Sequence, residues 1–385
     1  MIAFNETFPG SQITPPQGEE QDPRLFRVCH LSMGLCTGGL ERLLVDFARY
    51  HDPNRFELTF VALDKVARPA EEIRQLGCNV KVIPNFGKNW QQFGALFDFF
   101  RSRQFDVVHT HNSHPHFWGT LAARWAGVPV IVNTRHGQRF GQSLVGRTKF
   151  WFAGQLADRV ITVSEDAARL CLKEDHLPRR KVKRIWNGID TNRFAFQGPM
   201  QRPTFISVAR LSREKDFPTL LRAVAKASKQ VPDLELLLVG NGPERAHLQQ
   251  LVVELQIEQR VQLVGEQSDI PHWLARSGCF VSSSLTEGIS LTLLEAMAVG
   301  LPVLATAVGG NPEIVTHGVT GYLVPAQNVD ALADGIVRMW EQRSRWMEMG
   351  RAGRSRVAEQ FDIRQMIHGY EAEYLEHLLL KNHGK

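Results

Sequence analysis

Two carboxylates stand in an otherwise uncharged apolar segment, SGCFVSSSLTEGISLTLLEAMAVGLPVLATAVGGNP (residues 277–312), at Glu287 and Glu295. A carboxylate in such a segment is costly to bury unless a hydrogen-bond donor meets it. The pattern predicts a buried strand over CFVSSS, a turn at TEGIS, and a helix over LTLLEAMAVG that ends at Gly300. Glu287 then lies just ahead of the helix, and Glu295 lies about one turn inside it.

The predicted helix start offers a binding site for an anion. Backbone amides at a helix N-terminus are unpaired and attract negative charge. Here they belong to Gly288, Ile289, Ser290 and Leu291. An anion site between two carboxylates suits a ligand with both phosphates and hydroxyls, such as a nucleotide-sugar. The alternative is structural, with Glu287 as a charge at the helix start and Glu295 in an ion pair at the edge of the core, because charged groups of this kind mark sites only statistically.

Two further strand ends carry groups that suit a diphosphate. The turn MGLCTGGLE contains Gly38 and Gly39, and glycine lets the backbone approach a phosphate at a helix start. In VARLSREKDF, Arg210 follows a predicted strand and Lys215 precedes a predicted helix. Arginine offers a planar fork and lysine a point charge, which together suit a diphosphate. Two surface cations are the alternative interpretation.

The histidines of VVHTHNSHPH lie at the end of another predicted strand. Side chains alternate along a strand, so His109 and His111 share a face, and His111 is nearer the strand end. We therefore expect His111 to make a polar contact to a substrate. No spacing matches a known zinc pattern and no DxD occurs, so no metal and no other cofactor is expected.

Length and composition indicate a two-domain globular protein. The chain has 385 residues, of which 43% are hydrophobic and 22% charged, typical of globular proteins. There is no apolar run of membrane-spanning length, and the first residues do not resemble a signal peptide. Residues 1–23 are expected to be a disordered tail. The five cysteines are scattered, which favours reduced thiols and a cytoplasmic location.

Basic residues outnumber acidic ones in residues 24–195, whereas the two balance in residues 196–385. This asymmetry indicates an anionic ligand or surface. Nucleic acid is not expected, because no zinc finger, RNP motif or helix-turn-helix pattern occurs. Basic and aromatic residues alternate in RHGQRFGQSLVGRTKFW (residues 135–151), which resembles a membrane-surface helix. Peripheral contact with the anionic inner face of the plasma membrane is therefore one hypothesis, and a solvated helix face is the other.

Apolar strands and helices alternate along the whole chain. Strands that are apolar throughout and joined by helices predict parallel sheets covered on both faces. The segment FAFQGPMQRPT, rich in Gly and Pro, marks a boundary between residues 24–195 and 196–361. The predicted fold class is therefore α/β, with two doubly wound, Rossmann-like domains. Such domains bind ligands at the carboxyl ends of their strands.

Taken together, the motifs resemble family 4 retaining glycosyltransferases of the GT-B fold. The motifs occur in the family's order from about residue 27 to residue 361, as TGGLE, VVHTH, NTRHG, ITVSE, NGID, VARLSREKDF, VGNGPE, the Glu287/Glu295 pair and VGGNPEIV. The resemblance implies a nucleotide-diphosphate sugar donor, such as a UDP- or GDP-sugar, on the second domain. It also implies an acceptor on the first domain and metal-independent transfer. Residues 362–385 would form a final helix that crosses back to the first domain.

The resemblance also implies roles for individual residues. Arg210 and Lys215 would hold the donor diphosphate with help from the Gly38–Gly39 backbone, and Glu295 would bind the ribose. The donor sugar and its phosphate would meet Glu287 and the amides of residues 288–291, with His111 beside the reacting carbon. Three other residues are candidates for sugar or acceptor contacts, namely Glu41, Arg135 and His136.

These observations predict a hexosyltransferase that acts on a glycan or lipid-linked acceptor in cell-surface or exopolysaccharide synthesis. Two alternatives remain open from the sequence. A nucleotide-sugar 2-epimerase shares the fold but needs no acceptor. A non-catalytic protein would use the binding residues to hold a nucleotide-sugar without transferring the sugar.

Overall fold

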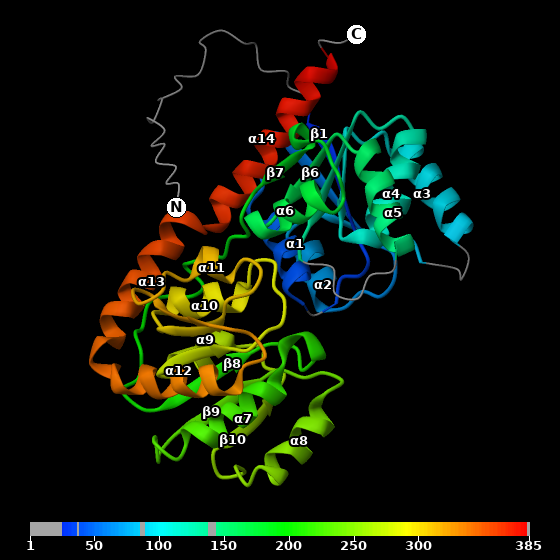
Figure 1. Cartoon of the computed structure of the whole chain (residues 1–385). Coiled ribbons are helices and arrows are strands. Elements are labelled where there is room, and N and C mark those ends of the chain that lie inside the picture. Colours follow the sequence, from blue (N-terminus) through cyan, green and yellow to red (C-terminus); the bar gives the residue numbers. More distant parts are fainter. Residues whose placement is uncertain (1–24, 37, 85–88, 138–143, 383–385) are drawn as a thin grey trace.

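The computed structural model describes residues 25–36, 38–84, 89–137 and 144–382, which form two α/β domains (Figure 1). The expected disordered tail, residues 1–23, lies outside the described residues, as do residues 138–143 of the basic and aromatic segment. No helix in the described part of the chain is long and apolar enough to cross a bilayer. All five cysteines are described, and all are free thiols.

The first domain is a 7-stranded parallel sheet in the order β3-β2-β1-β4-β5-β6-β7. Its strands are β1 (Phe26–Ser32), β2 (Phe56–Ala62), β3 (Asn79–Val82), β4 (Val107–His111), β5 (Val130–Arg135), β6 (Arg159–Thr162) and β7 (Val182–Arg184). Its helices are α1 (Gly39–Tyr50), α2 (Arg68–Gln75), α3 (Asn89–Arg103), α4 (Ser113–Trp125), α5 (Leu144–Leu156), α6 (Glu165–Lys173) and the short η1 (Arg179–Lys181).

The second domain is a 6-stranded parallel sheet in the order β10-β9-β8-β11-β12-β13. Its strands are β8 (Thr204–Val208), β9 (Glu235–Val239), β10 (Val261–Gly265), β11 (Cys279–Ser282), β12 (Val303–Thr306) and β13 (Gly321–Val324). Its helices are η2 (Arg213–Lys215), α7 (Phe217–Ala227), α8 (Arg245–Glu254), α9 (Ile270–Ala275), α10 (Leu291–Val299), α11 (Asn311–Ile314), α12 (Val329–Glu341), η3 (Arg343–Arg345) and α13 (Trp346–Gln360).

Both sheets reverse their strand order beside their first strand, between β1 and β4 in one domain and between β8 and β11 in the other. Strands β4, β5, β8, β11 and β12 are buried along their whole length, which explains the apolar residues that each of them contains. In a doubly wound sheet, ligands bind at the carboxyl ends of the strands beside such a reversal. The glycine turn follows β1, and Arg210 follows β8, so both predicted diphosphate segments lie at these points.

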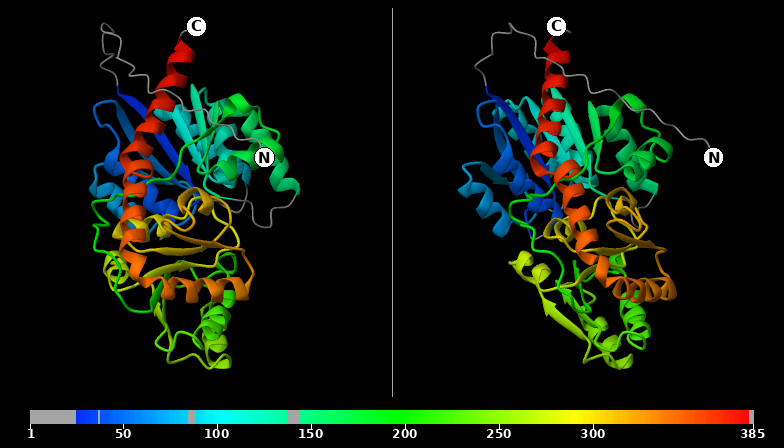
Figure 2. Two further views of the ribbon diagram at one scale, coloured as in Figure 1. Left: turned by 60° about the vertical axis from the view of Figure 1, so that its left-hand side comes forward. Right: turned by 90° about the vertical axis from the view of Figure 1, so that its left-hand side faces the viewer.

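The chain crosses between the domains twice, and the two crossings pair with each other. The N–H of Ile189 donates to the carbonyl of Phe361 at 2.9 Å, and the N–H of Ile363 donates back to the carbonyl of Ile189 at 3.0 Å. After this junction, α14 (Ile363–Asn382) runs along the first domain (Figure 2). Its Tyr370 and Tyr374 are buried in the core of that domain.

A buried ion network fastens α14 to the first sheet. The carboxylate of Glu373 is fully buried, accepts a hydrogen bond from Nε of Arg159 at 2.6 Å, and pairs with Lys183. A buried carboxylate with two cationic partners is satisfied, whereas removal of its partners would leave an uncompensated charge. The last helix is therefore a structural part of the first domain.

Close packing at the double crossing generates a testable prediction. A Cβ added at Gly188 would lie 2.6 Å from the carbonyl oxygen of Asp362. Because both groups are backbone, Gly188→Ala must push the crossings apart, and we expect it to lower the free energy of unfolding by about 1–3 kcal/mol. Gly94→Ala, in α3 with no atom within 4 Å of its added Cβ, is the control and should gain about 0.5–1 kcal/mol. Denaturant titration measures both, and an unchanged Gly188→Ala protein would contradict this account.

Candidate active site at the domain interface

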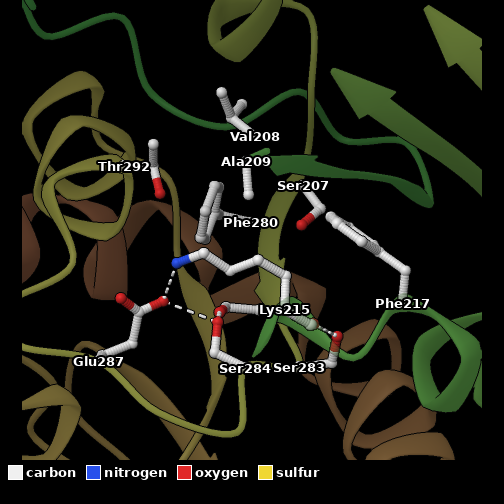
Figure 3. Close-up of a pocket in the computed structure, with 11 residues that line it drawn as sticks. Ser207, Val208, Ala209, Lys215, Phe217, Phe280, Ser283, Ser284, Glu287 and Thr292 are labelled. Carbon is white, nitrogen blue, oxygen red and sulfur yellow. Dashed lines mark hydrogen bonds and ion pairs between the residues drawn. The ribbon is translucent and has the colours of Figure 1, made fainter. Parts of the chain in front are cut away.

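A pocket at the carboxyl ends of β8 and β11 holds two of the predicted residues in direct contact. Nζ of Lys215 lies 2.6 Å from Oε1 of Glu287, and the hydroxyl of Ser284 donates to the same oxygen at 2.7 Å (Figure 3). The hydroxyl of Ser283 in turn donates to the carbonyl of Lys215 at 2.8 Å. From the sequence we expected Lys215 to bind the donor diphosphate and Glu287 to bind the donor sugar. The ion pair between these two side chains was not predicted.

The start of α10 presents the predicted anion site. Ser290 precedes the helix, and no side chain caps it. Within the described part of the chain, the N–H groups of residues 288–291 donate to no acceptor. Gly288, Ile289 and Ser290 are nevertheless buried. Unpaired N–H groups at a buried helix start are unfavourable in the absence of a ligand. The arrangement is therefore suited to an anion that accepts these hydrogen bonds.

Four other predicted residues lie on the segments that follow β8 and β1, namely Arg210, Gly38, Gly39 and Glu41. Arg210 is exposed, and its guanidinium has no hydrogen bond or ion pair with the described residues. A Cβ added to Gly39 would lie 3.3 Å from Cδ1 of Leu291, so the glycine turn of the first domain touches the first residue of α10. Glu41 folds back over the same turn, since a Cβ on Gly38 would meet its carboxylate at 2.3 Å, and burial raises the pKa of Glu41.

Glu295 lies one turn further along α10, in a second pocket between the domains. That pocket is lined from the first domain and the crossing segment by Arg42, Asp46, Asp190 and Arg193. No hydrogen bond to the Glu295 carboxylate is present among the described residues. Burial raises the pKa of Glu295 from 4.5 to about 7. The structure thus separates the two glutamates into adjacent pockets on either side of the α10 N-terminus.

The structure places both ring nitrogens of His111 in hydrogen bonds with other imidazoles. Its Nδ1 lies 2.9 Å from Nε2 of His136, and its Nε2 lies 3.1 Å from Nδ1 of His30. Burial, together with the neighbouring imidazoles, holds the pKa of His111 well below its ordinary value. Because both ring nitrogens are already engaged, a polar contact of His111 with a substrate would have to replace one of these hydrogen bonds, and that contact stays a prediction. The outer nitrogen of this group, Nδ1 of His136, has no partner among the described residues.

Arg135 is likewise paired within its own domain. Its guanidinium donates to Oδ2 of Asp175 at 2.8 Å and to Sγ of Cys171 at 3.2 Å, and its side chain is 5% exposed. It also lies over the ring of Phe150. A buried arginine held by a carboxylate and an aromatic ring joins α5, α6 and the end of β5. Arg135 is therefore held within the first domain, and its contact with a sugar or acceptor stays a prediction.

Sequence reasoning missed two residues, His30 and Glu313. His30 could have been noticed as a histidine within the apolar strand FRVCHLS. Glu313, in α11 of the second domain, accepts hydrogen bonds from the N–H of Glu165 at 2.8 Å and from the indole of Trp186 at 2.8 Å. It thereby caps the start of α6 in the other domain, a favourable place for a carboxylate. No local pattern signals such a cap, because its acceptor and donors are far apart in the sequence.

Ring nitrogens of His30, His109 and His111 lie within 4.8 Å of one another. Nδ1 of His109 lies 2.6 Å from the hydroxyl of Tyr374, and its Nε2 lies 2.7 Å from that of Thr134. With both nitrogens of His109 and of His111 in hydrogen bonds, a metal ion here would have to displace several of them. The cluster therefore fits a hydrogen-bonded network better than a ligand set.

Comparison with known proteins identifies the class. Residues 37–193 match the family model described as Glycosyltransferase Family 4, and residues 188–356 match Glycosyl transferases group 1. The N-acetyl-alpha-D-glucosaminyl L-malate synthase of Bacillus anthracis is 31% identical over 299 residues, which cover 73% of this chain and 77% of that relative. The chain belongs to glycosyltransferase family 4, and it is a glycosyltransferase. The comparisons give no support to the 2-epimerase alternative.

Further relatives agree in length and in fold. The UDP-Gal:alpha-D-GlcNAc-diphosphoundecaprenol alpha-1,3-galactosyltransferase of Escherichia coli is 24% identical over 92% of this chain and 98% of its own. The crystal structure of Anabaena HepE in complex with UDP and glucose matches with a TM-score of 0.80 at 22% identity, covering 91% of this chain and 99% of that one. The predicted GT-B fold with two Rossmann-like domains is thereby confirmed.

The raised pKa of Glu295 generates a prediction about stability and pH. A carboxyl with a raised folded-state pKa contributes stability that is present below its unfolded value, 4.5, and lost as the pH rises through about 7. Glu295→Gln does not titrate, so it should match the wild type at pH 5 and exceed it at pH 8 by up to about 3 kcal/mol. Denaturant titrations at both pH values measure the difference. If Glu295→Gln changed the free energy of unfolding equally at pH 5 and pH 8, the pKa of Glu295 would not be raised in the folded protein.

Proposed function

We propose that this chain transfers a hexose from a UDP- or GDP-sugar, with retention of anomeric configuration and without a metal. The acceptor is a glycan or lipid-linked sugar in cell-surface or exopolysaccharide synthesis. The observation that carries the proposal is the start of α10, which is buried and has no capping side chain. It lies between Glu287 and Glu295 and against the glycine turn of the other domain. The Escherichia coli relative is named for a UDP-sugar donor and a diphosphoundecaprenol acceptor.

The order of groups along α10 matches the order of groups in a nucleotide-sugar. The unpaired amides of residues 288–291 donate hydrogen bonds to the diphosphate, and Arg210 adds a free cation. One helical turn, about 5.4 Å, separates the helix start from Glu295, whose unpaired carboxylate receives the ribose hydroxyls. On the other side, Glu287 is oriented by Ser284 and Lys215 and receives hydroxyls of the transferred sugar.

Breaking the bond between the sugar and the diphosphate leaves negative charge on the departing phosphate oxygen. Fixed donors stabilise such charge most when they are in place before the reaction. Here these are the α10 amides, the free Arg210 and Lys215, which exchanges part of its pairing with Glu287 for the phosphate. A divalent metal supplies the same kind of stabilisation in other enzymes, and these cations and amides take that role in the proposal.

The experiment that tests this proposal is transfer in the presence of a chelator. Purified protein is incubated with UDP- and GDP-hexoses and a lipid-diphosphate-linked N-acetylglucosamine, and the product is analysed by mass spectrometry and NMR. We expect an α-linked product from an α-linked donor, undiminished by EDTA. Lys215→Met should weaken UDP binding about ten- to a hundredfold, as expected for the loss of a charged hydrogen bond worth about 1.5–3 kcal/mol.

The matched control is Lys226→Met, in α7 of the same domain, where the lysine is exposed and pairs with Asp330; its UDP affinity should not change. Transfer that EDTA abolishes and Mn²⁺ restores would contradict metal independence. Consumption of donor in the absence of any acceptor would contradict the transfer itself.

We also propose peripheral contact with an anionic membrane through α5. Its exposed Leu144, Val145, Trp151 and Phe152 recur at helical spacing, and Arg147 on the same helix is exposed as well. An apolar stripe with basic neighbours is typical of helices that lie in a membrane interface. It would bring the first domain, where the acceptor is expected, to a lipid-linked substrate.

Vesicle flotation tests this contact. We expect binding to vesicles that contain phosphatidylglycerol, no binding to phosphatidylcholine alone, and release by salt, since exposed charges are screened within about 8–10 Å at physiological ionic strength. The double variant Trp151→Ser/Phe152→Ser should lose binding, whereas Val253→Ser, exposed on α8 of the second domain, should keep it. Equal flotation of both variants would assign the contact to another surface.

A further inference from the structure

Three imidazoles form a continuous hydrogen-bonded array across three neighbouring strands. His30 lies on β1, His111 ends β4, and His136 follows β5, and these strands are adjacent in the sheet. His30 and His111 are almost completely inaccessible to solvent, and their rings stack with an interplanar angle of 12°. The array runs from the interior of the first domain to its interface with the second.

The number of protons in this array is fixed. Burial lowers the pKa of His30 and of His136 to about 3, so all three rings are neutral near pH 7, and each carries one N–H. Each of the two shared hydrogen bonds uses one N–H and one bare nitrogen. If both bonds are made, one outer nitrogen carries a hydrogen and the other does not. These outer nitrogens are Nε2 of His30 and Nδ1 of His136, neither of which has a partner among the described residues.

The surroundings of His30 decide the direction of the array. Its ring packs between Phe47, at 4.7 Å between centroids, and Phe60, at 5.0 Å. A buried N–H without an acceptor is rarer in proteins than an acceptor without a donor. Both outer nitrogens are buried without a partner, but only His136 lies at the interface with the second domain, where a bound ligand can supply an acceptor. His30 is therefore protonated on Nδ1 and donates to His111, which donates from its own Nδ1 to His136. His136 then carries its hydrogen on the outer Nδ1.

His136 lies beside the loop that precedes α10. A Cβ added to Gly288 would lie 2.1 Å from the main-chain carbonyl oxygen of His136, and Gly288 directly follows Glu287. The backbone of His136, the last residue of the array, thus contacts the residue that follows Glu287, the proposed sugar-binding residue. An N–H donor there meets a sugar oxygen, whereas a bare nitrogen would meet a hydroxyl hydrogen.

We propose that His30 and His111 are positioning residues that fix the tautomer of His136, so that its Nδ1–H donates to an oxygen of the transferred sugar. This inference rests on the proposed function. It requires no proton transfer and no charged imidazole, because it concerns which nitrogen carries the hydrogen before the sugar binds. His30 acts through two hydrogen bonds and does not itself touch the substrate.

The first test reads the tautomers directly. Full-length protein labelled with ¹⁵N at histidine is examined by long-range ¹H–¹⁵N correlation, which distinguishes a protonated from a bare ring nitrogen, with His→Gln variants for assignment. We expect hydrogen on Nδ1 of all three rings in the ligand-free protein. Hydrogen on Nε2 of His136, or zinc in the purified protein that disappears in the His30→Phe variant, would overturn the proposal.

The second test separates positioning from packing. His30→Phe keeps an aromatic ring but breaks the array, and should lower kcat/KM for the nucleotide-sugar at least about tenfold. Affinity for free UDP should not change, because UDP lacks the transferred hexose that meets His136. His30→Asn, whose amide nitrogen can replace Nδ1 as the donor, should retain kcat/KM within about threefold. Equal losses in both variants, or full activity of His30→Phe, would overturn the proposal.

The matched control is His116→Phe, which replaces another buried imidazole of the first domain. His116 lies near the hydroxyls of Thr110 and Thr120, outside the array. The His116→Phe protein should unfold at a lower temperature than the wild type, without loss of kcat/KM per folded molecule. If the wild-type protein transfers no sugar at all, the proposed function fails, while the tautomers read by NMR still decide the inference about the array.

Discussion

The start of α10 must be buried between two domains and yet remain without a cap, and the rest of the site is arranged around this requirement. Close backbone packing keeps it in place. A Cβ at Gly309 would lie 1.9 Å from the carbonyl oxygen of Glu287, and the N–H of Gly310 donates to the carbonyl of Gly288 at 2.9 Å. Because glycine backbone holds the loop from one side, the amides on the other side are directed away from internal acceptors and stay unpaired.

The parts of the structure that the sequence predicted depend on local patterns. The apolar run after Glu287 forms α10 and ends at Gly300, which adopts the left-handed conformation with φ of 97°. Arg210 and Lys215 flank the turn after β8, where alternating strands and helices placed them. Such features follow from the preferences of a few consecutive residues. The fold class followed in the same way, because apolar strands joined by helices permit few other arrangements.

The parts that the sequence did not predict depend on which strands become neighbours. His111 has one ring nitrogen bonded to His30, which is 81 residues away, because β1 inserts between β2 and β4, and the other is bonded to His136. Arg135 is drawn into the first domain by Asp175, 40 residues further along the chain. Strand order and long-range ion pairs are properties of the whole sheet. A histidine or arginine at a strand end can therefore face the cleft or bond to distant residues within its domain, and a motif alone does not predict which of the two occurs.

The polar groups across the interface explain how ligand binding and domain contact are coupled. Glu313 of the second domain accepts from the N–H of Glu165 at the start of α6 in the first, where Ser164 already caps the N–H of Ala167, so this contact is complete in the protein alone. The N–H groups at the start of α10 lack acceptors, whereas the carboxylate of Glu295 lacks donors. A nucleoside diphosphate carries both, phosphate oxygens at one end and ribose hydroxyls at the other. In the proposed function, one ligand would remove both deficits at once. Because the pocket around Glu295 is lined from both domains, that ligand would also stabilise the domains in contact.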